Sequence, residues 1–310
     1  MRVSYFGPSG TFTEMALERF ELDGGFGTPA GGRTGPVERV SAAAPGATLE
    51  AVRTGAVDGA VVPFENSIEG AVPATLDALV QGSRLQIVAE NELDITFAIL
   101  TARPIDPAEV RTICGYPHAT AQVRDWLARF VPDAEVRFAA SNAAAALDVA
   151  AGHADAAVST ALAGRQLGLH TLADGISDVS DARTRFVYVT GPDAVPAATG
   201  DDRTTVVVEP TNAPGALHGA LTEFATRGVD LTFIESRPTK TLRGTYRFFL
   251  ECSGHIDDPL VREAIEALYR RMHIRFLGSR PAAGGSPAPR PSGTTGSRAW
   301  VDRMRTGVPE

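Results

Sequence analysis

The sequence predicts an α/β protein in two parts, a two-lobed α/β region followed by a small α+β domain of ferredoxin-like order. Strand-like and helix-like segments alternate from residue 2 to about residue 189, which is typical of βαβ units on a mostly parallel sheet. The alternation breaks near Arg103-Pro104 and then starts again, which predicts a second lobe. A polar stretch at 193–203 then precedes a βαββαβ pattern, which is the ferredoxin-like order.

In the first part, residues 2–6 predict a strand, and 11–20 predict a helix with Thr11 or Thr13 as its N-cap. The glycine-rich stretch 23–36 lacks the lysine of a phosphate-binding loop and predicts a mobile surface loop. Further strands are expected at 59–64, in two runs of 85–100 on either side of 90–94, and at 112–115, 134–138, 156–158 and 185–189. Further helices are expected at 49–53, 71–80, 119–130, 142–151 and 159–167.

The small domain follows the same reasoning with fewer elements. Its strands are expected at 204–209, 231–236, 245–251 and 273–277, and its helices at 215–226 and 259–272. Residues 281–298 consist mostly of Pro, Gly, Ser and Ala, so the chain is expected to end in a disordered tail over 281–310. Residues 300–304 could form one helical turn, to which we assign no function.

Composition excludes several functional classes. The chain of 310 residues has 29 basic and 37 acidic side chains, a net charge of −8, which argues against binding nucleic acid or anionic membranes. Cys114 and Cys252 stand far apart and the six histidines lack metal-ligand spacing, so we expect no disulfide scaffold and no metal site. No apolar leader and no membrane-length apolar run is present. We expect a reduced, cytoplasmic protein.

Four segments carry polar groups at places where such folds bind ligands. Residues 7–13 join a strand to a helix and offer backbone N–H groups to an anion. In residues 62–70, Glu65, Asn66 and Ser67 lie at the carboxyl end of a predicted strand. In residues 183–189, Thr184 and Arg185 lie at the start of another. In the small domain, 212–217 and 235–238 carry no strong nucleophile and suit a small-ligand pocket. For each segment, an ordinary turn, cap or surface role stays open.

Taken together, these segments resemble the prephenate dehydratase family over about residues 1–280. GPSGTFTEMA, VPFENSIEG and Thr184-Arg185-Phe186 resemble its catalytic motifs, and NAPGAL and ESRP resemble the two ligand-binding motifs of an attached ACT regulatory domain. The sequence departs from the family at Ala182, often asparagine, and at Tyr116-Pro117-His118, commonly His-Pro-Gln, whereas Gln122 carries over.

The resemblance implies a catalytic domain over 1–192, a linker over 193–203, an ACT domain over 204–280 and the tail. Within the catalytic domain, lobe one would comprise about 1–100 and 176–192, and lobe two about 101–175. The fold implied is that of the type 2 periplasmic binding proteins, with the site between the lobes.

The activity implied is the decarboxylating dehydration of prephenate to phenylpyruvate in phenylalanine biosynthesis, without metal or cofactor. Thr184 would donate a hydrogen bond to the departing hydroxyl group. Arg185, Asn66 and Glu65 would complete the catalytic set, with Arg185 and Asn66 binding the substrate carboxylates and Glu65 orienting its neighbours. The implied substrate contacts are Thr11, Ser67, Gln122 and Phe186.

The resemblance also implies feedback inhibition by L-phenylalanine and a homo-oligomer, a dimer or tetramer, with the effector bound between protomers. The implied effector contacts are Asn212, Gly215, Ala216, Leu217, Glu235 and Ser236. Two other functions stay open: an arogenate dehydratase, whose substrate differs by an amino group, and a non-catalytic solute-binding module fused to an amino-acid sensor. A transcriptional regulator would need a basic helix-turn-helix, which we do not find.

Overall fold

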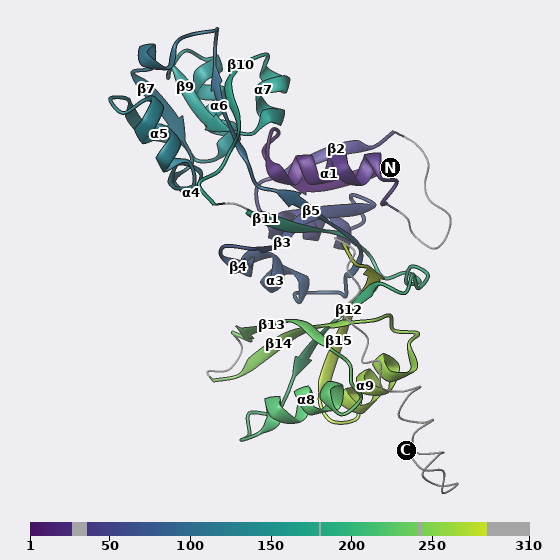
Figure 1. Cartoon of the computed structure of the whole chain (residues 1–310). Helices are drawn as coiled ribbons and strands as arrows, with labels where there is room; N and C mark the ends of the chain where they lie inside the picture. The colour runs from purple at the N-terminus through teal and green to yellow at the C-terminus, as the bar shows by residue number, and fades with distance from the viewer. Residues whose placement is uncertain (27–35, 180, 241–243, 284–310) are drawn as a thin grey trace, which may run out of the picture. The chain divides into compact units, whose positions relative to one another are not determined.

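The computed structural model describes residues 1–26, 36–179, 181–240 and 244–283. The chain divides into two compact units, Met1–Pro196 and Ala197–Glu310. The first unit holds two α/β lobes, each with its own sheet, and Figure 1 shows β7 to β10 gathered into a group separate from the sheet that contains β1, β3 and β11.

The sheet of lobe one has the order β2-β1-β3-β11-β5, with a short strand β4 paired to β3. Its strands are β1 (Arg2–Phe6), β2 (Glu38–Ala42), β3 (Gly59–Asn66), β4 (Gly70–Ala71), β5 (Gln86–Asp94) and β11 (Arg183–Thr190). Its helices are α1 (Phe12–Leu22), α2 (Pro45–Arg53) and α3 (Pro73–Leu79). The returning strand β11 lies between β3 and β5 and is antiparallel to both.

Lobe two is an insertion between two neighbouring strands of lobe one. The chain leaves after β5 and returns at β11, and these strands pair directly, with Arg183 opposite Asp94. The sheet of lobe two has the order β10-β6-β9-β7-β8. Its strands are β6 (Phe97–Thr101), β7 (Thr112–Gly115), β8 (Glu135–Phe138), β9 (Ala156–Ser159) and β10 (His170–Ile176). Its helices are α4 (Pro117–Ala121), α5 (Arg124–Phe130), α6 (Asn142–Ala150) and α7 (Ala161–Leu167), with a short 3-10 turn η1 (Pro107–Glu109) before β7.

The second unit has the predicted βαββαβ order. Its sheet runs β13-β14-β12-β15, built from β12 (Asp202–Glu209), β13 (Leu231–Pro238), β14 (Tyr246–Ser253) and β15 (His273–Pro281). The helices α8 (Ala216–Ala225) and α9 (Pro259–Tyr269) pack through Ala220, Phe224, Ala264 and Leu268 onto Val206 and Leu250 of the sheet. The ferredoxin-like prediction is therefore confirmed for this unit.

Several predicted boundaries were wrong for identifiable reasons. Both sheets of the first unit are mixed rather than mostly parallel, because β11 and β6 run against their neighbours. The predicted break over 90–94 does not exist, since β5 continues to Asp94 along β11. The predicted helix over 119–130 is two helices, because the backbone leaves helical geometry at Val123 and the carbonyl of Gln122 accepts a hydrogen bond from Asp178.

The predicted tail and glycine-rich loop lie partly outside the described residues. Pro281 belongs to β15, where it pairs with Asp202, so the disorder prediction was wrong at this residue. Residues 284–310 and 27–35 are outside the described ranges. Within the residues that the structure describes, no helix combines the length and hydropathy that crossing a bilayer requires.

Candidate active site

The two central motifs meet where β3 pairs with β11. Thr184 lies opposite Asn66 in the ladder, although 118 residues separate them in the sequence. The side-chain amide of Asn66 donates a hydrogen bond of 2.8 Å to the hydroxyl oxygen of Thr184. Thr184 is 7% exposed, so its hydroxyl sits in a largely enclosed position at the end of the strand. The strand β3 thus continues through Asn66, beyond the predicted end at Phe64.

The amide of Asn66 is held in one orientation. Its side-chain oxygen accepts hydrogen bonds from the backbone N–H groups of Ile68, at 2.8 Å, and Glu69, at 3.2 Å. The amide nitrogen must therefore face Thr184. A threonine hydroxyl has a single hydrogen, and because its oxygen accepts from Asn66, that hydrogen is directed elsewhere. The arrangement prepares the Thr184 hydroxyl to donate a hydrogen bond to a bound molecule.

Arg185 has partners within the protein. Its guanidinium donates to Glu65 at 2.7 Å and to Glu90 at 3.2 Å, and it lies over the ring of Phe64, 4.8 Å from the ring centre. The side chain is only 5% exposed. Two carboxylates therefore already occupy a guanidinium that the sequence assigned to substrate carboxylates. Consecutive residues of a strand point to opposite faces, so Arg185 and Thr184 face different sides of the sheet.

The remaining predicted substrate contacts lie in different surroundings. Ser67 pairs with the backbone of Arg183, whose N–H donates to its hydroxyl at 2.9 Å. Thr11 is the N-cap of α1 and accepts from the N–H of Glu14. Gln122 is 7% exposed, and its side-chain oxygen has no hydrogen-bond partner among the described residues. Phe186 is 2% exposed and packs in the core of lobe one, which favours a structural role over substrate contact.

The first glycine motif joins the two lobes. Gly10 has a φ of +82°, and a side chain there would meet Ala163 of α7 in lobe two at 2.9 Å. Its carbonyl accepts from the hydroxyl of Thr160 at 2.6 Å. The carboxylate of Glu14, only 4% exposed, accepts from the Gly10 N–H at 2.7 Å and from the amide of Gln166 at 3.1 Å. Sequence reasoning missed this interlobe clasp of Gly10, Glu14, Thr160 and Gln166.

A second contact links the lobes near the VPFENSIEG motif. His118, one of the residues that depart from the family pattern, lies 3.3 Å from the carboxylate of Glu69 in lobe one. The other departure, Ala182, is 4% exposed and packs with Ile95 and Phe97. An apolar side chain fits that position, because an asparagine amide there would be buried.

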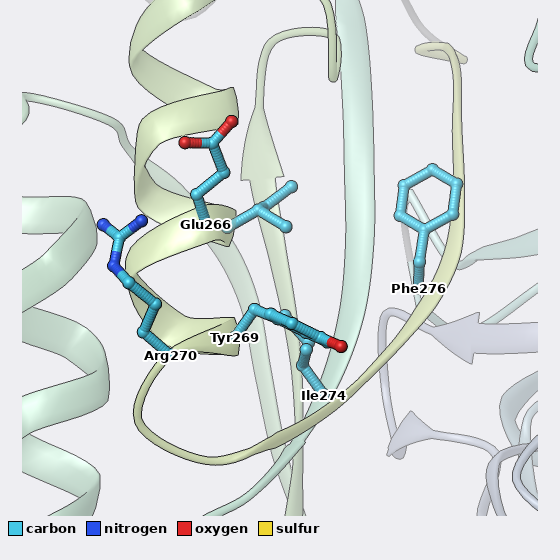
Figure 2. A pocket seen from close by; sticks show the side chains of 6 residues that line it. Glu266, Tyr269, Arg270, Ile274 and Phe276 are labelled. Carbon is cyan, nitrogen blue, oxygen red and sulfur yellow. The ribbon is translucent and has the colours of Figure 1, made fainter.

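The predicted effector residues occupy two segments of the second unit. Asn212, Gly215, Ala216 and Leu217 form the loop and start of α8, and Glu235 and Ser236 lie on β13, an edge strand of the sheet. Gly215 has a φ of +78°, which explains the glycine. A pocket of about 460 Å³ lies elsewhere on the unit, between α9 and β15. Figure 2 shows Glu266, Tyr269 and Arg270 on the helix and Ile274 and Phe276 on the segment that follows it, and none of the predicted effector residues lines this pocket.

The fold and the site together define a class of protein. Its members have a two-lobed α/β unit with an oriented threonine hydroxyl, and a βαββαβ domain follows that unit in the chain. Comparison with known families makes the assignment specific. The prephenate dehydratase family model matches residues 3–194, and the ACT domain model matches residues 204–268. The chain belongs to the prephenate dehydratase family.

Individual relatives and solved structures match the chain over nearly its whole length. Prephenate dehydratase of Mycobacterium tuberculosis strain H37Rv is 50% identical over 313 residues, which covers 100% of this chain and 96% of the relative. A crystal structure of prephenate dehydratase from Arthrobacter aurescens in complex with L-Phe has a TM-score of 0.84 and 37% identity, covering 99% of this chain and 100% of that one. The structure of GqqA, described as a novel type of quorum quenching acylase, has a TM-score of 0.79 and 26% identity, covering 92% and 99%.

Proposed function

We propose that this chain is a lyase that converts prephenate to phenylpyruvate, water and carbon dioxide. The carbon–carbon bond to the ring carboxylate breaks, and its electron pair enters the ring as the ring hydroxyl leaves. The leaving group takes up one proton and becomes water, and the ring becomes aromatic. The observation that carries the proposal is the Asn66–Thr184 pair, which leaves the threonine hydrogen free to reach a leaving oxygen.

Thr184 supplies the hydrogen bond to the departing hydroxyl. A threonine hydroxyl is a weak acid, so donation is concerted with carbon–oxygen cleavage, and solvent restores the proton afterwards. Such assistance is worth roughly 10²–10⁴ in rate. Asn66 is a positioning residue for this step. Its amide donates a hydrogen bond to the hydroxyl oxygen of Thr184, so the hydroxyl hydrogen points away from Asn66.

Substrate binding is assigned to polar groups of both lobes. The buried amide of Gln122, with an unpartnered oxygen, supports a contact from lobe two. Thr11 and Ser67 add hydroxyl groups in lobe one. Arg185 takes a different role from the one the motif implied, because Glu65 and Glu90 already hold its guanidinium; it neutralises carboxylate charge that would repel a dianionic substrate.

We further propose that L-phenylalanine inhibits the enzyme through the ACT domain. The match of residues 204–268 to the ACT model and the L-Phe complex of the Arthrobacter relative support this effector. The contacts proposed are Asn212, Gly215, Ala216, Leu217, Glu235 and Ser236. An effector site between protomers would require a dimer or tetramer. Two free cysteines, Cys114 and Cys252, are compatible with the cytoplasm that we propose as its compartment.

The test is ultraviolet detection of phenylpyruvate from purified protein and prephenate, with and without L-phenylalanine. We expect turnover that phenylalanine lowers. Competing arogenate against prephenate in the same assay decides between the two dehydratases. Tight prephenate binding without product would instead identify a solute-binding module and overturn the proposal.

A further inference from the structure

The side chain of Glu90 is a buried acid that lies outside the motifs, and the proposed mechanism uses it only as a partner of Arg185. It comes from β5, the edge strand next to β11, and the side chain is 0% exposed. An ionised carboxylate in such a place is costly unless a cation pairs with it. Its partner is Arg185, at 3.2 Å, the residue that follows Thr184 on β11.

The guanidinium of Arg185 connects three strands. From the middle strand β11 it reaches Glu90 on β5 and Glu65 on β3, and Phe64 of β3 lies beneath it at 4.8 Å. The ladder here includes a bulge, since Arg185 pairs with Glu65 while Phe186 pairs with Pro63. A bulge leaves one residue unpaired and interrupts the ladder locally. A side chain that binds both neighbouring strands links them across this interruption, at the residue adjacent to Thr184.

The two carboxylates hold Arg185 unequally. Glu65 is 38% exposed, so its side chain has room to move, whereas that of Glu90 is fully enclosed. Glu90 is therefore the fixed end of the arrangement. We propose that Glu90 is a positioning residue, which anchors Arg185, fixes β11 between its neighbours and keeps the Thr184 hydroxyl against Asn66. The kinetic consequence of this inference rests on the proposed function, but its structural consequence does not.

The substitution Glu90→Gln keeps a hydrogen-bond acceptor of the same shape and removes the charge, while Glu90→Ala removes both. We expect kcat for phenylpyruvate formation to fall about 10–100-fold in Glu90→Ala and less in Glu90→Gln, with KM changed less than about threefold. The matched control is Asp94→Ala. Asp94 lies on the same strand and pairs with Arg183 of β11 at 3.0 Å, but it is 73% exposed, and we expect its loss to leave kcat unchanged.

Two readouts separate positioning from simple stabilisation. In a Thr184→Ala background, Glu90→Ala should lower the residual rate less than about twofold, because the group it positions is gone. The same fold-loss in both backgrounds, or a raised KM with unchanged kcat, would overturn the inference.

The second readout needs no turnover. In methyl-labelled protein, the Thr184 methyl resonance should shift in Glu90→Gln and stay in place in Asp94→Ala. An unshifted resonance in Glu90→Gln would refute the positioning role, whether or not the unaltered chain acts on prephenate. Should Glu90→Ala fail to fold, Glu90→Gln supplies both measurements. Absence of product from the unaltered chain would count against the proposed function alone.

Discussion

Among the residues that the structure describes, two arginines of the sheets are almost fully enclosed, and their partners differ. Arg185 faces two carboxylates, Glu65 and Glu90, one of which is 38% exposed. Arg280 of β15, 0% exposed, binds the carboxylate of Glu251 at 2.6 Å and the hydroxyl of Thr205 at 2.8 Å. The first network has two carboxylates for one guanidinium, and one of these carboxylates is partly exposed; the second pairs one guanidinium with one carboxylate within a sheet. From this difference we expect the first network to serve position and the second to serve stability.

The largest expected effect tests the catalytic side of this comparison. The substitution Thr184→Ala should lower kcat by about 10²–10⁴, because it removes the proposed donor while leaving the Arg185 network in place. Circular dichroism and the free energy of unfolding should change little, since only a hydroxyl and one methyl group are lost. Turnover close to that of the unaltered enzyme would remove Thr184 from the mechanism.

The pair of Arg280 and Glu251 should behave in the opposite way. We expect Arg280→Met to lower the free energy of unfolding by about 3–5 kcal/mol, because it strands the enclosed carboxylate of Glu251. Chemical denaturation measures this loss. The rate per folded molecule should stay within about twofold of the unaltered enzyme. A large kcat loss in fully folded protein would show that the two networks are not different in kind.

Inhibition by phenylalanine tests whether the second unit has a regulatory role in addition to folding stably. The substitution Gly215→Trp should abolish inhibition by phenylalanine, a coupling worth about 1–3 kcal/mol, while catalysis remains measurable. The control is Gly228→Trp. Gly228 has a left-handed φ of +65°, similar to the +78° of Gly215, but it lies beyond the other end of α8. Equal inhibition of the Gly215→Trp and unaltered proteins would place the effector elsewhere.

The smallest predicted effect concerns Glu14, a buried acid held by neutral donors as well as by an arginine. Burial acts to raise the pKa of Glu14, but hydrogen bonds from Gly10, Ser9, Gln166 and Arg39 outweigh it and hold the pKa below 4.5. A lowered pKa in the folded state means that its ionised form stabilises the fold above about pH 4.5, and that this contribution disappears as pH falls through the folded-state value.

The matching variant is Glu14→Gln. We expect it to lose about 1–2 kcal/mol of stability at pH 7, and the difference from the unaltered protein should shrink as the pH is lowered below about 4.5. Denaturation curves between pH 7 and pH 3.5 measure it. A difference that stays constant over this range would mean that the charge of Glu14 does not contribute.

Sequence reasoning located the elements whose signals are local. The strand over 59–64 was predicted because its apolar run is continuous. Thr11 and Thr13 were the two candidate N-caps because a cap precedes its helix directly, and the structure has Thr11 in that role. The edge strands β2 and β10 were missed, since exposed strands carry little apolar pattern. Asn66 and Thr184 were each assigned to the site from motifs alone, whereas the hydrogen bond between them was not predicted, because neither segment carries a local signal of contact.

Glu90 and the interlobe clasp were out of reach for a different reason. The contacts of these residues depend on how the elements are placed in the fold. Glu90 reaches Arg185 because β11 inserts beside β5, and no pattern in either strand specifies that pairing. Gln166 likewise reads as an ordinary helix residue until α7 is placed against Gly10. The revision of Arg185 from substrate contact to neutralising residue has the same origin.

The placement of β11 also has a consequence for synthesis on the ribosome. Asn66 emerges early in translation, but Thr184 follows 118 residues later, after all of lobe two has been made. Until then the nascent chain carries β3 and β5 without the strand that joins them, so two unpaired backbone edges await a partner. The last strand of the unit thus closes the sheet and completes the Asn66–Thr184 pair in a single event.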